Sequence, residues 1–357
     1  MPHVAARTAR TASRDRDTGR YQSHRPEQTL LYQIVDEYYP AFAALMAEQG
    51  KELPGYVQRE FEEFLQCGRL EHGFLRVRCE SCHAEHLVAF SCKRRGFCPS
   101  CGARRMAESA ALLVDEVLPE QPMRQWVLSF PFQLRFLFAS RPEIMGRVLG
   151  IVYRVIATHL VKKAGHTHQV AKTGAVTLIQ RFGSALSLNV HFHMLFLDGV
   201  YVEQSHGSAR FRWVKAPTSP ELTQLTHTIA HRVGRYLERQ GLLERDVENS
   251  YLASDAVDDD PMTPLLGHSI TYRIAVGSQA GRKVFTLQTL PTSGDPFGDG
   301  IGKVAGFSLH AGVAARADER KKLERLCRYI SRPAVSEKRL LRIRLLSIRF
   351  WRTLTSR

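Results

Sequence analysis

The sequence predicts an α+β protein, with a helical, cysteine-rich N-terminal module followed by a larger mixed domain. Three observations predict this class. Six of the seven cysteines lie between Cys67 and Cys101, helical periodicity precedes them, and strand-like and helix-like stretches intermix after residue 124 without a strict βαβ alternation. The length of 357 residues suits one large domain or two smaller ones, each with an ample core.

The N-terminal module combines two helices with a cysteine-rich segment. Apolar residues recur at helical spacing over Pro26–Gln66, and Gly50 and Pro54 divide this stretch into two helices. Short β-like runs such as Leu87–Phe90 lie among the cysteines, and Met106–Leu118 is typical of a connecting helix. We therefore expect a disordered basic tail over residues 1–25, a helical and metal-binding domain over 26–105, and a connecting helix over 106–123.

The larger domain is expected over residues 124–340. Trp126–Phe130 is typical of a buried strand and Pro142–Lys163 of a long helix, while Ala175–Phe182 and Leu188–Leu197 are strand-like runs on either side of a short turn. The other expected elements are strands over Phe211–Val214, Ser269–Val276, Lys283–Leu290 and Ala305–Leu309, helices over Pro220–Gln240 and Ala314–Ser331, and an atypical basic tail over 341–357.

The charge of the chain indicates a polyanionic partner. The formal net charge is +15, which favours nucleic acid over an anionic membrane surface or a merely solubilising excess. No run approaches the 18 or more apolar residues of a membrane span, and the N-terminus lacks the apolar middle of a secretory signal. We therefore expect a cytoplasmic protein associated with the nucleoid.

The cysteine spacing predicts a metal site. Cys79-x-x-Cys82 and Cys98-x-x-Cys101 are separated by 15 residues, as in a zinc ribbon whose two knuckles each supply two thiolates. Thiols of a cytoplasmic chain stay reduced, so the cluster indicates metal ligation rather than disulfides. Four thiolates leave no open position, and the expected Zn²⁺ is therefore structural. Cys67 and Cys92 lie nearby and could enlarge the site or replace a ligand.

Basic residues surround the cysteines. They form either a solvated face or a set of phosphate contacts, and the charge of the whole chain favours phosphate contacts. The candidate DNA-binding residues here are Arg94, Arg95, Arg104 and Arg105.

A pair of histidines in Asn189–Phe196 predicts a second metal site. On a strand, His191 and His193 point to the same face. The alternative is two polar residues on a solvent-facing strand, but Leu195 and Leu197 share their face and indicate that it is covered. A rigid strand would then hold two imidazoles side by side, and buried imidazoles need partners such as a metal.

A third ligand for this second site is left open. Gln180 on the preceding strand could face the histidine pair across a hairpin, and His310 follows another strand. The residue pattern does not choose between them.

The helix over Ala314–Ser331 carries a candidate nucleophile. Its apolar residues fall on one stripe, which should face the core, and Tyr329 lies at the edge of this stripe. A phenol is a poor nucleophile at neutral pH because it is protonated, but arginines nearby favour the phenolate and bind phosphate. Arg328 and Arg332 are the further candidate DNA-binding residues.

Three segments together resemble the transposases of the insertion-sequence-91 family. CESCHAEHLVAFSCKRRGFCPSCGARRM, from Cys79 to Met106, resembles the zinc-binding domain of that family. NVHFHMLFLDG, from Asn189, resembles its histidine–hydrophobe–histidine (HUH) strand, and LCRYISRP, from Leu326, resembles its catalytic-tyrosine helix. The three segments occur in the order that the family has.

The resemblance implies an HUH endonuclease domain with a central antiparallel sheet flanked by helices. His191 and His193 would bind Mg²⁺ or Mn²⁺ at the scissile phosphate of single-stranded DNA, with Gln180 as a candidate oxygen ligand. Tyr329 would attack that phosphate and form a 5′-phosphotyrosine link during rolling-circle-type transposition. Partners would then be single-stranded element ends and target DNA, and the chain could act as a homodimer.

The sequence departs from the family pattern in two places. Arg325 stands one helical turn before Tyr329, where some relatives carry a second tyrosine, and the tail over 341–357 does not resemble the expected continuation. A truncated copy without activity is therefore one alternative. The others are a zinc-ribbon regulator that binds nucleic acid without catalysis, and a replication initiator of plasmid or phage type that uses the same chemistry.

Overall fold

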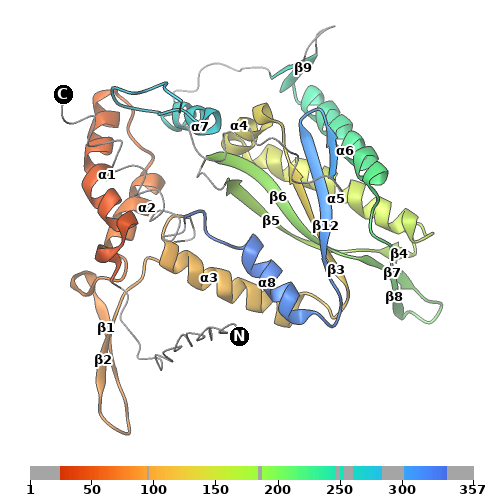
Figure 1. Cartoon of the computed structure of the whole chain (residues 1–357), viewed down its shortest axis with the longest axis horizontal. Coiled ribbons are helices and arrows are strands. Elements are labelled where there is room, and N and C mark those ends of the chain that lie inside the picture. The colour runs from red at the N-terminus through yellow and green to blue at the C-terminus, as the bar shows by residue number, and fades with distance from the viewer. Residues whose placement is uncertain are drawn as a thin grey trace, which may run out of the picture.

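A computed structural model of the chain describes residues 25–94, 96–183, 187–245, 250–252, 260–283 and 301–335 (Figure 1). The two tails expected at 1–25 and 341–357 lie outside these residues, except for Arg25. Most of the strand expected over Lys283–Leu290 also lies outside them. Figure 1 shows the N-terminal helices and a projecting hairpin on one side, and the large sheet with its helices on the other.

A five-stranded antiparallel sheet forms the centre of the larger domain. Its strand order is β11-β12-β3-β6-β5, so β5 is an edge strand and β6 lies between β3 and β5. The predicted α+β class with a central antiparallel sheet is therefore confirmed. The strands are β3 (Met123–Ser129), β5 (Ala175–Phe182), β6 (Leu188–Leu197), β11 (Ile301–Val304) and β12 (Phe307–Ala315).

One face of the sheet carries the main apolar core. Side chains alternate along β6, and its residues Phe192 and Phe196 are fully buried against Trp126 of β3 and the helices of this face. Helix α6 has a capped start, where Thr218 and Glu221 form a reciprocal capping box. The helices are α4 (Phe132–Ser140), α5 (Pro142–Lys163), α6 (Ser219–Arg239) and α7 (Met262–Thr271).

Helices α3 (Pro99–Leu112) and α8 (Arg320–Ile330) lie side by side on the opposite face (Figure 1). In α8, apolar residues recur at i, i+3, i+4 and i+7 and form a stripe that packs on Leu195 and Leu197 of β6. A short π-helix, Leu113–Val117, continues α3 toward β3. The buried residues of the stripe are Leu323, Leu326, Cys327 and Ile330. This packing fixes the end of α8 over the second face of the sheet.

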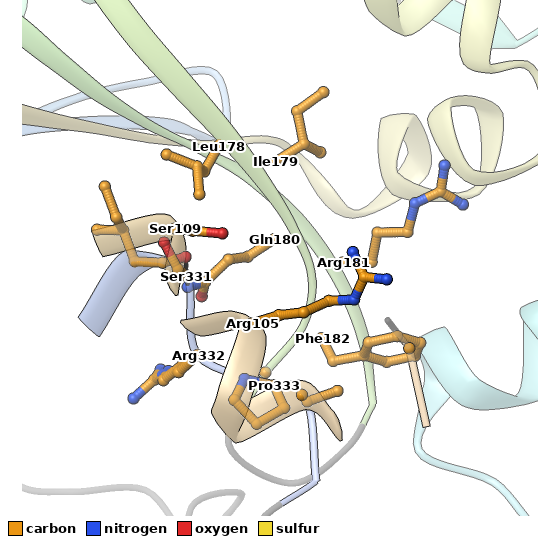
Figure 2. A pocket seen from close by; sticks show the side chains of 15 residues that line it. Arg105, Ser109, Leu178, Ile179, Gln180, Arg181, Phe182, Ser331, Arg332 and Pro333 are labelled. Atoms are coloured by element: carbon orange, nitrogen blue, oxygen red, sulfur yellow. Dashed lines mark hydrogen bonds between the residues drawn. The ribbon is translucent and has the colours of Figure 1, made fainter. Parts of the chain in front are cut away.

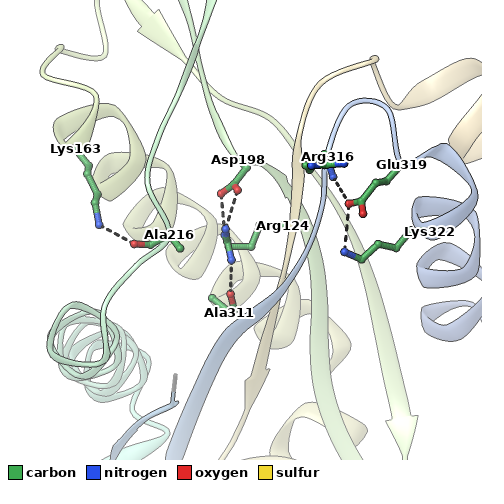
Figure 3. Close-up of polar contacts among 8 residues, drawn as sticks. All are labelled: Arg124, Lys163, Asp198, Ala216, Ala311, Arg316, Glu319 and Lys322. Carbon is green, nitrogen blue, oxygen red and sulfur yellow. Dashed lines mark hydrogen bonds and ion pairs between the residues drawn. The ribbon is translucent and has the colours of Figure 1, made fainter. Parts of the chain in front are cut away.

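A buried ion pair joins three segments of the large domain (Figure 3). Arg124 of β3 donates two hydrogen bonds of 2.8 Å to the carboxylate of Asp198 and one of 2.9 Å to the carbonyl oxygen of Ala311. Ala311 lies where the register between β12 and β3 shifts. The guanidinium thus satisfies a carboxylate and an irregular backbone position that would otherwise be buried without partners.

Helix α5 is the one described helix long and apolar enough to cross a membrane by length and composition. Its residues Val148, Val152 and Ile156 are fully buried in the main core. The apolar stripe of α5 is therefore accounted for by packing against the sheet and α6.

The N-terminal module consists of helices and a hairpin that reaches away from the sheet (Figure 1). Helix α1 begins where the side chain of Thr29 accepts a hydrogen bond from the backbone of Tyr32. The hairpin strands pair over five residues each, from Phe74↔Ala89 to Arg78↔Glu85. The elements are the 3₁₀ turns Pro26–Gln28 and Leu70–His72, α1 (Leu30–Glu48), α2 (Gly55–Gln66), β1 (Phe74–Arg78) and β2 (Glu85–Ala89).

Short strands complete the described structure. A three-stranded sheet of order β4-β7-β8 packs beside α5, and β9 pairs with β10. The strand predicted over Ser269–Val276 is wrong, because α7 runs to Thr271 and packs against α4 and β6. These contacts override the local β-like composition. The strands are β4 (Ala171–Lys172), β7 (Gly199–Glu203), β8 (Ala209–Trp213), β9 (Leu243–Arg245) and β10 (Ser250–Leu252).

Candidate functional site

Four cysteine sulfurs gather in the N-terminal module: Cys67, Cys92, Cys98 and Cys101, all within 4.8 Å of one another. The Sγ–Sγ distance is 3.7 Å for two pairs and 3.8 Å for a third. A tetrahedral ion with Zn–S bonds of about 2.3 Å would separate its sulfurs by about 3.8 Å. The donor set and its spacing therefore fit zinc in a closed, structural site.

This cluster corrects the predicted zinc ligands. Cys98 and Cys101 are members, but Cys67 and Cys92 take the places expected for Cys79 and Cys82. Cys79 and Cys82 are exposed beyond the far end of the β1–β2 hairpin. Five residues at ~3.4 Å each carry that end roughly 17 Å from the hairpin base.

The local folding of the chain explains why these four cysteines meet. Cys67 ends α2 and Cys98 precedes the first residue of α3, with Cys101 in the first turn. At the base of the hairpin, the backbone N–H of Gly68 donates to the carbonyl of Phe90, which brings Cys92 beside α2. The backbone N–H of Cys92 also donates to the sulfur of Cys67 over 3.3 Å.

The histidine pair lies on β6, under helix α8. The ring centroids of His191 and His193 are 4.9 Å apart, and the side chain of His193 is buried. Nδ1 of His191 lies 2.7 Å from the carbonyl oxygen of Asn189. Because a carbonyl only accepts, this Nδ1 carries the proton and Nε2 keeps its lone pair.

Gln125 of β3 holds the second imidazole, a contact that the sequence analysis did not find. Nε2 of its amide lies 2.7 Å from Nδ1 of His193. Turning the amide by 180° places its oxygen at this position, and in that orientation Nδ1–H donates to the oxygen and Nε2 of the ring keeps its lone pair. Nε2 of His193 is buried and makes no hydrogen bond among the described residues. It is an orphaned buried polar atom of the kind that a bound ion would satisfy.

Burial keeps both imidazoles in the neutral form that binds metals. Desolvation lowers the pKa of His193 to about 3, and repulsion from a protonated His191 ring and from the Arg332 guanidinium would add to this effect. Desolvation also lowers the pKa of His191. Both rings are therefore neutral at physiological pH.

Tyr329 lies next to this pair, at the C-terminal end of α8. Its ring centroid is 5.9 Å from that of His193, and the two rings meet edge to face. The guanidinium carbon of Arg332 lies 4.4 Å from the centre of the tyrosine ring. Since Tyr329 is 47% exposed, its phenol is accessible from solvent while its helix is anchored in the core.

Gln180 contacts the tyrosine helix. It lies opposite His191 in the β5–β6 register, and its Nε2 donates to the carbonyl oxygen of Ile330 over 2.8 Å. A longer contact of 3.5 Å reaches the carbonyl oxygen of Tyr329. This amide therefore positions the end of α8, and its role as a third metal ligand stays a prediction.

The predicted DNA-binding arginines fall into separate groups. Arg94 pairs with Glu63 on α2, and Arg328 donates to Glu324 on its own helix over 2.7 Å. Arg104 is exposed on α3, while Arg95 lies outside the described residues. Arg105 and Arg332 line one groove beside the tyrosine helix. The guanidinium groups of Arg94 and Arg328 already have carboxylate partners, so their charge is the least available for phosphate.

Two family models match the chain. The model described as "Transposase zinc-binding domain" matches residues 34–130, and the model described as "Putative transposase" matches residues 174–354, more than half of the chain. No curated protein and no solved structure matches. The first match includes all four clustered cysteines, and the zinc-binding family together with this cluster supports a structural zinc ion. The second includes the histidine pair, Tyr329 and most of the tail that we expected to depart from the family pattern.

Proposed function

The chain belongs to the insertion-sequence-91 (IS91) type of transposases, which act on DNA, and we propose that it cleaves and rejoins single-stranded DNA through Tyr329. One observation supports this proposal above all: the tyrosine ring lies 5.9 Å from the ring of His193, whose buried Nε2 lacks a hydrogen-bond partner among the described residues. The proposed nucleophile on α8 thus lies over the sheet face that carries the two proposed metal-binding imidazoles.

The histidines would hold Mg²⁺ or Mn²⁺ through the two Nε2 atoms. Such an ion supplies Lewis-acid polarisation of a phosphate. The protein residues set the direction of this binding, because the carbonyl of Asn189 and the amide of Gln125 fix the two Nδ1 atoms. Two imidazoles alone are a poor set for Mg²⁺, so an oxygen ligand such as Oε1 of Gln180 belongs to the proposal.

The tyrosine would perform an in-line displacement. Its phenol O–H loses its proton, the phenol oxygen bonds to the phosphorus, the bond from phosphorus to the 3′ oxygen breaks, and the departing 3′ oxygen takes up a proton. The product is a 5′-phosphotyrosine and a free 3′-hydroxyl. Arg332 lies over the tyrosine ring and stabilises negative charge on the phenol oxygen and on the phosphate. The phosphotyrosine conserves the bond energy for rejoining in a rolling-circle-type cycle.

Rejoining requires a second nucleophilic step. Position 325, one turn before Tyr329, is an arginine, so α8 offers one tyrosine to this step. Either the released Tyr329 acts again or Tyr329 of a second copy acts in a homodimer. Mixing the parent protein with the Tyr329→Phe variant distinguishes these routes. If two copies cooperate, the variant should lower the rate at which the parent joins DNA and leave the rate of the first cleavage unchanged. If one copy performs both steps, the variant should change neither rate.

Cleavage of a single-stranded oligonucleotide bearing a candidate element end tests the function. With Mn²⁺ we expect nicking and a covalent protein–DNA adduct, both abolished in Tyr329→Phe. His191→Ala should abolish nicking and leave DNA binding largely intact. Nicking by His191→Ala at the parental rate would show that the histidine pair is not part of the reaction.

A further inference from the structure

A groove runs from the cysteine module to the tyrosine helix. Three segments form its walls. They are helix α3, residues 178–183 at the end of the edge strand β5, and residues 330–334, which begin at the last residue of α8. Its volume is about 770 Å³, within the range of sites that hold a ligand of a few hundred daltons. It reaches the candidate active site through Gln180 and Arg332, which line it and also contact the backbone or ring of Tyr329.

The lining of this groove is cationic and partly aromatic. Among the lining residues that the structure describes, three are arginines and none is acidic: Arg105, Arg181 and Arg332. Figure 2 shows the side chain of Arg105 extending from α3 toward β5, where Arg181 and Phe182 lie. Phe182 is 40% exposed, although it is a large apolar side chain at the end of a strand. Arginines with an exposed aromatic ring are the usual means of holding a phosphate backbone and a stacked base.

We propose that this groove binds single-stranded DNA next to the scissile phosphate, with Arg105 on the backbone and Phe182 stacked on a base. The proposal rests on the proposed single-strand cleavage and extends it to the path of the strand. A groove of this volume is large enough for a few nucleotides of a single strand, and stacking on Phe182 requires an unpaired base. The strand would leave the tyrosine past Arg332 and run toward the zinc module.

The zinc module is part of this site because its helix forms one wall. A Cβ on Gly102 of α3 would lie 2.7 Å from the ring of Pro333, so the helix and the segment after α8 are in close contact. Val335 then packs in the apolar cluster around Cys67 and Cys98. The zinc site therefore stabilises the groove at both α3 and the segment that follows the tyrosine.

Binding measured without cleavage tests the groove. We would use the full zinc-loaded chain carrying Tyr329→Phe, without added Mg²⁺ or Mn²⁺, and follow the anisotropy of a labelled 20-nucleotide single strand. Phe182→Leu should weaken binding roughly 5- to 150-fold, the range for loss of one stacked base. Arg105→Ala should weaken it roughly 5- to 10-fold and lower the slope of log K against log salt by about 0.7.

Matched controls separate the groove from general charge and apolarity. Arg232 is exposed on α6, which packs on the other face of the sheet and does not line the groove, and Phe132 is 42% exposed on α4. Arg232→Ala and Phe132→Leu should change single-strand affinity less than twofold. Phe182→Tyr and Arg105→Lys keep the ring and the charge, so they should bind within about threefold of the parent.

Three outcomes would overturn the proposal: parental affinity in both groove variants, equal losses in the control variants, or an equal loss for duplex DNA of the same sequence. A groove variant that fails to fold is recognised by its melting temperature and zinc content, and the Tyr and Lys variants then decide. Cleavage by the parent is scored separately. If the parent cleaves DNA but the groove variants bind it as the parent does, the groove proposal is refuted and the nuclease proposal is not. If the groove variants lose binding but the parent forms no covalent adduct, the nuclease proposal is refuted and the groove proposal is not.

Discussion

Replacing Cys92 by serine tests the corrected zinc site. Cys92 supplies one of four sulfurs whose separations match the edge of a zinc tetrahedron, and Cys101 lies 3.7 Å from it. A structural zinc contributes on the order of 10 kcal/mol of apparent binding free energy, comparable to the roughly 5–15 kcal/mol that stabilise a whole domain. Loss of a ligand should therefore unfold the apolar cluster around Cys67 and Cys98 rather than merely loosen it.

The assay is zinc content by atomic emission together with thermal unfolding, and Cys82→Ser is the matched control. Both residues are cysteines of the same module, but Cys82 is exposed beyond the hairpin end. Cys92→Ser should lose the zinc held by the four clustered cysteines and the thermal unfolding transition of the apolar cluster around Cys67 and Cys98. Cys82→Ser should keep both the zinc and this transition. The reasoning is refuted if Cys82→Ser releases this zinc and Cys92→Ser retains it.

Three further predictions concern the sheet and the histidine pair. Gln125→Leu removes the 2.7 Å contact to Nδ1 of His193, and it should lower Mn²⁺ affinity by roughly 10- to 100-fold; calorimetry that finds unchanged affinity would contradict this positioning role. Arg124→Ala leaves the buried carboxylate of Asp198 without its partner, and it should cost about 3–5 kcal/mol of unfolding free energy in urea, a cost that the double variant with Asp198→Ala should partly recover. Burial lowers the pKa of His193 to about 3, so below pH 6.5 the unfolded chain takes up a proton that the folded chain does not. The free energy of unfolding, measured without divalent ions, should therefore fall by about 2 kcal/mol from pH 7 to pH 5. His193→Asn should lack this component, and an identical pH dependence in parent and variant would disprove it.

Periodicity was sufficient for the elements that carry the candidate site. The predicted bounds Pro142–Lys163, Ala175–Phe182 and Leu188–Leu197 are those of α5, β5 and β6. Each is long, and each has a strong pattern because one face is buried. The same-face placement of His191 and His193 follows from the alternation along a strand and needs no knowledge of the fold.

Tertiary contacts decided what the sequence analysis could not find. The predicted helix over Ala314–Ser331 begins only at Arg320, because Ala314 and Ala315 still pair with β3. The cysteine spacing predicted two zinc knuckles, but the pairing of β1 with β2 places Cys79 and Cys82 at the far end of the hairpin. Cys67 and Cys92, near the base of the hairpin, join Cys98 and Cys101 instead. Gln125 could not be assigned to the site from the sequence, because its contact with His193 depends on the pairing of β3 with β6. In that register Gln125 lies opposite Leu195, two residues along β6 from His193.

Mapping the covalent product tests the central claim most directly. The parent protein, zinc-loaded and supplied with Mn²⁺, would be reacted with a single-stranded element end, digested with protease and nuclease, and examined by mass spectrometry. We predict a nucleotide joined through its 5′-phosphate to the peptide that contains Tyr329. A link to another residue, or a link through a 3′-phosphate, would contradict the proposal that Tyr329 and the histidine pair form one catalytic centre.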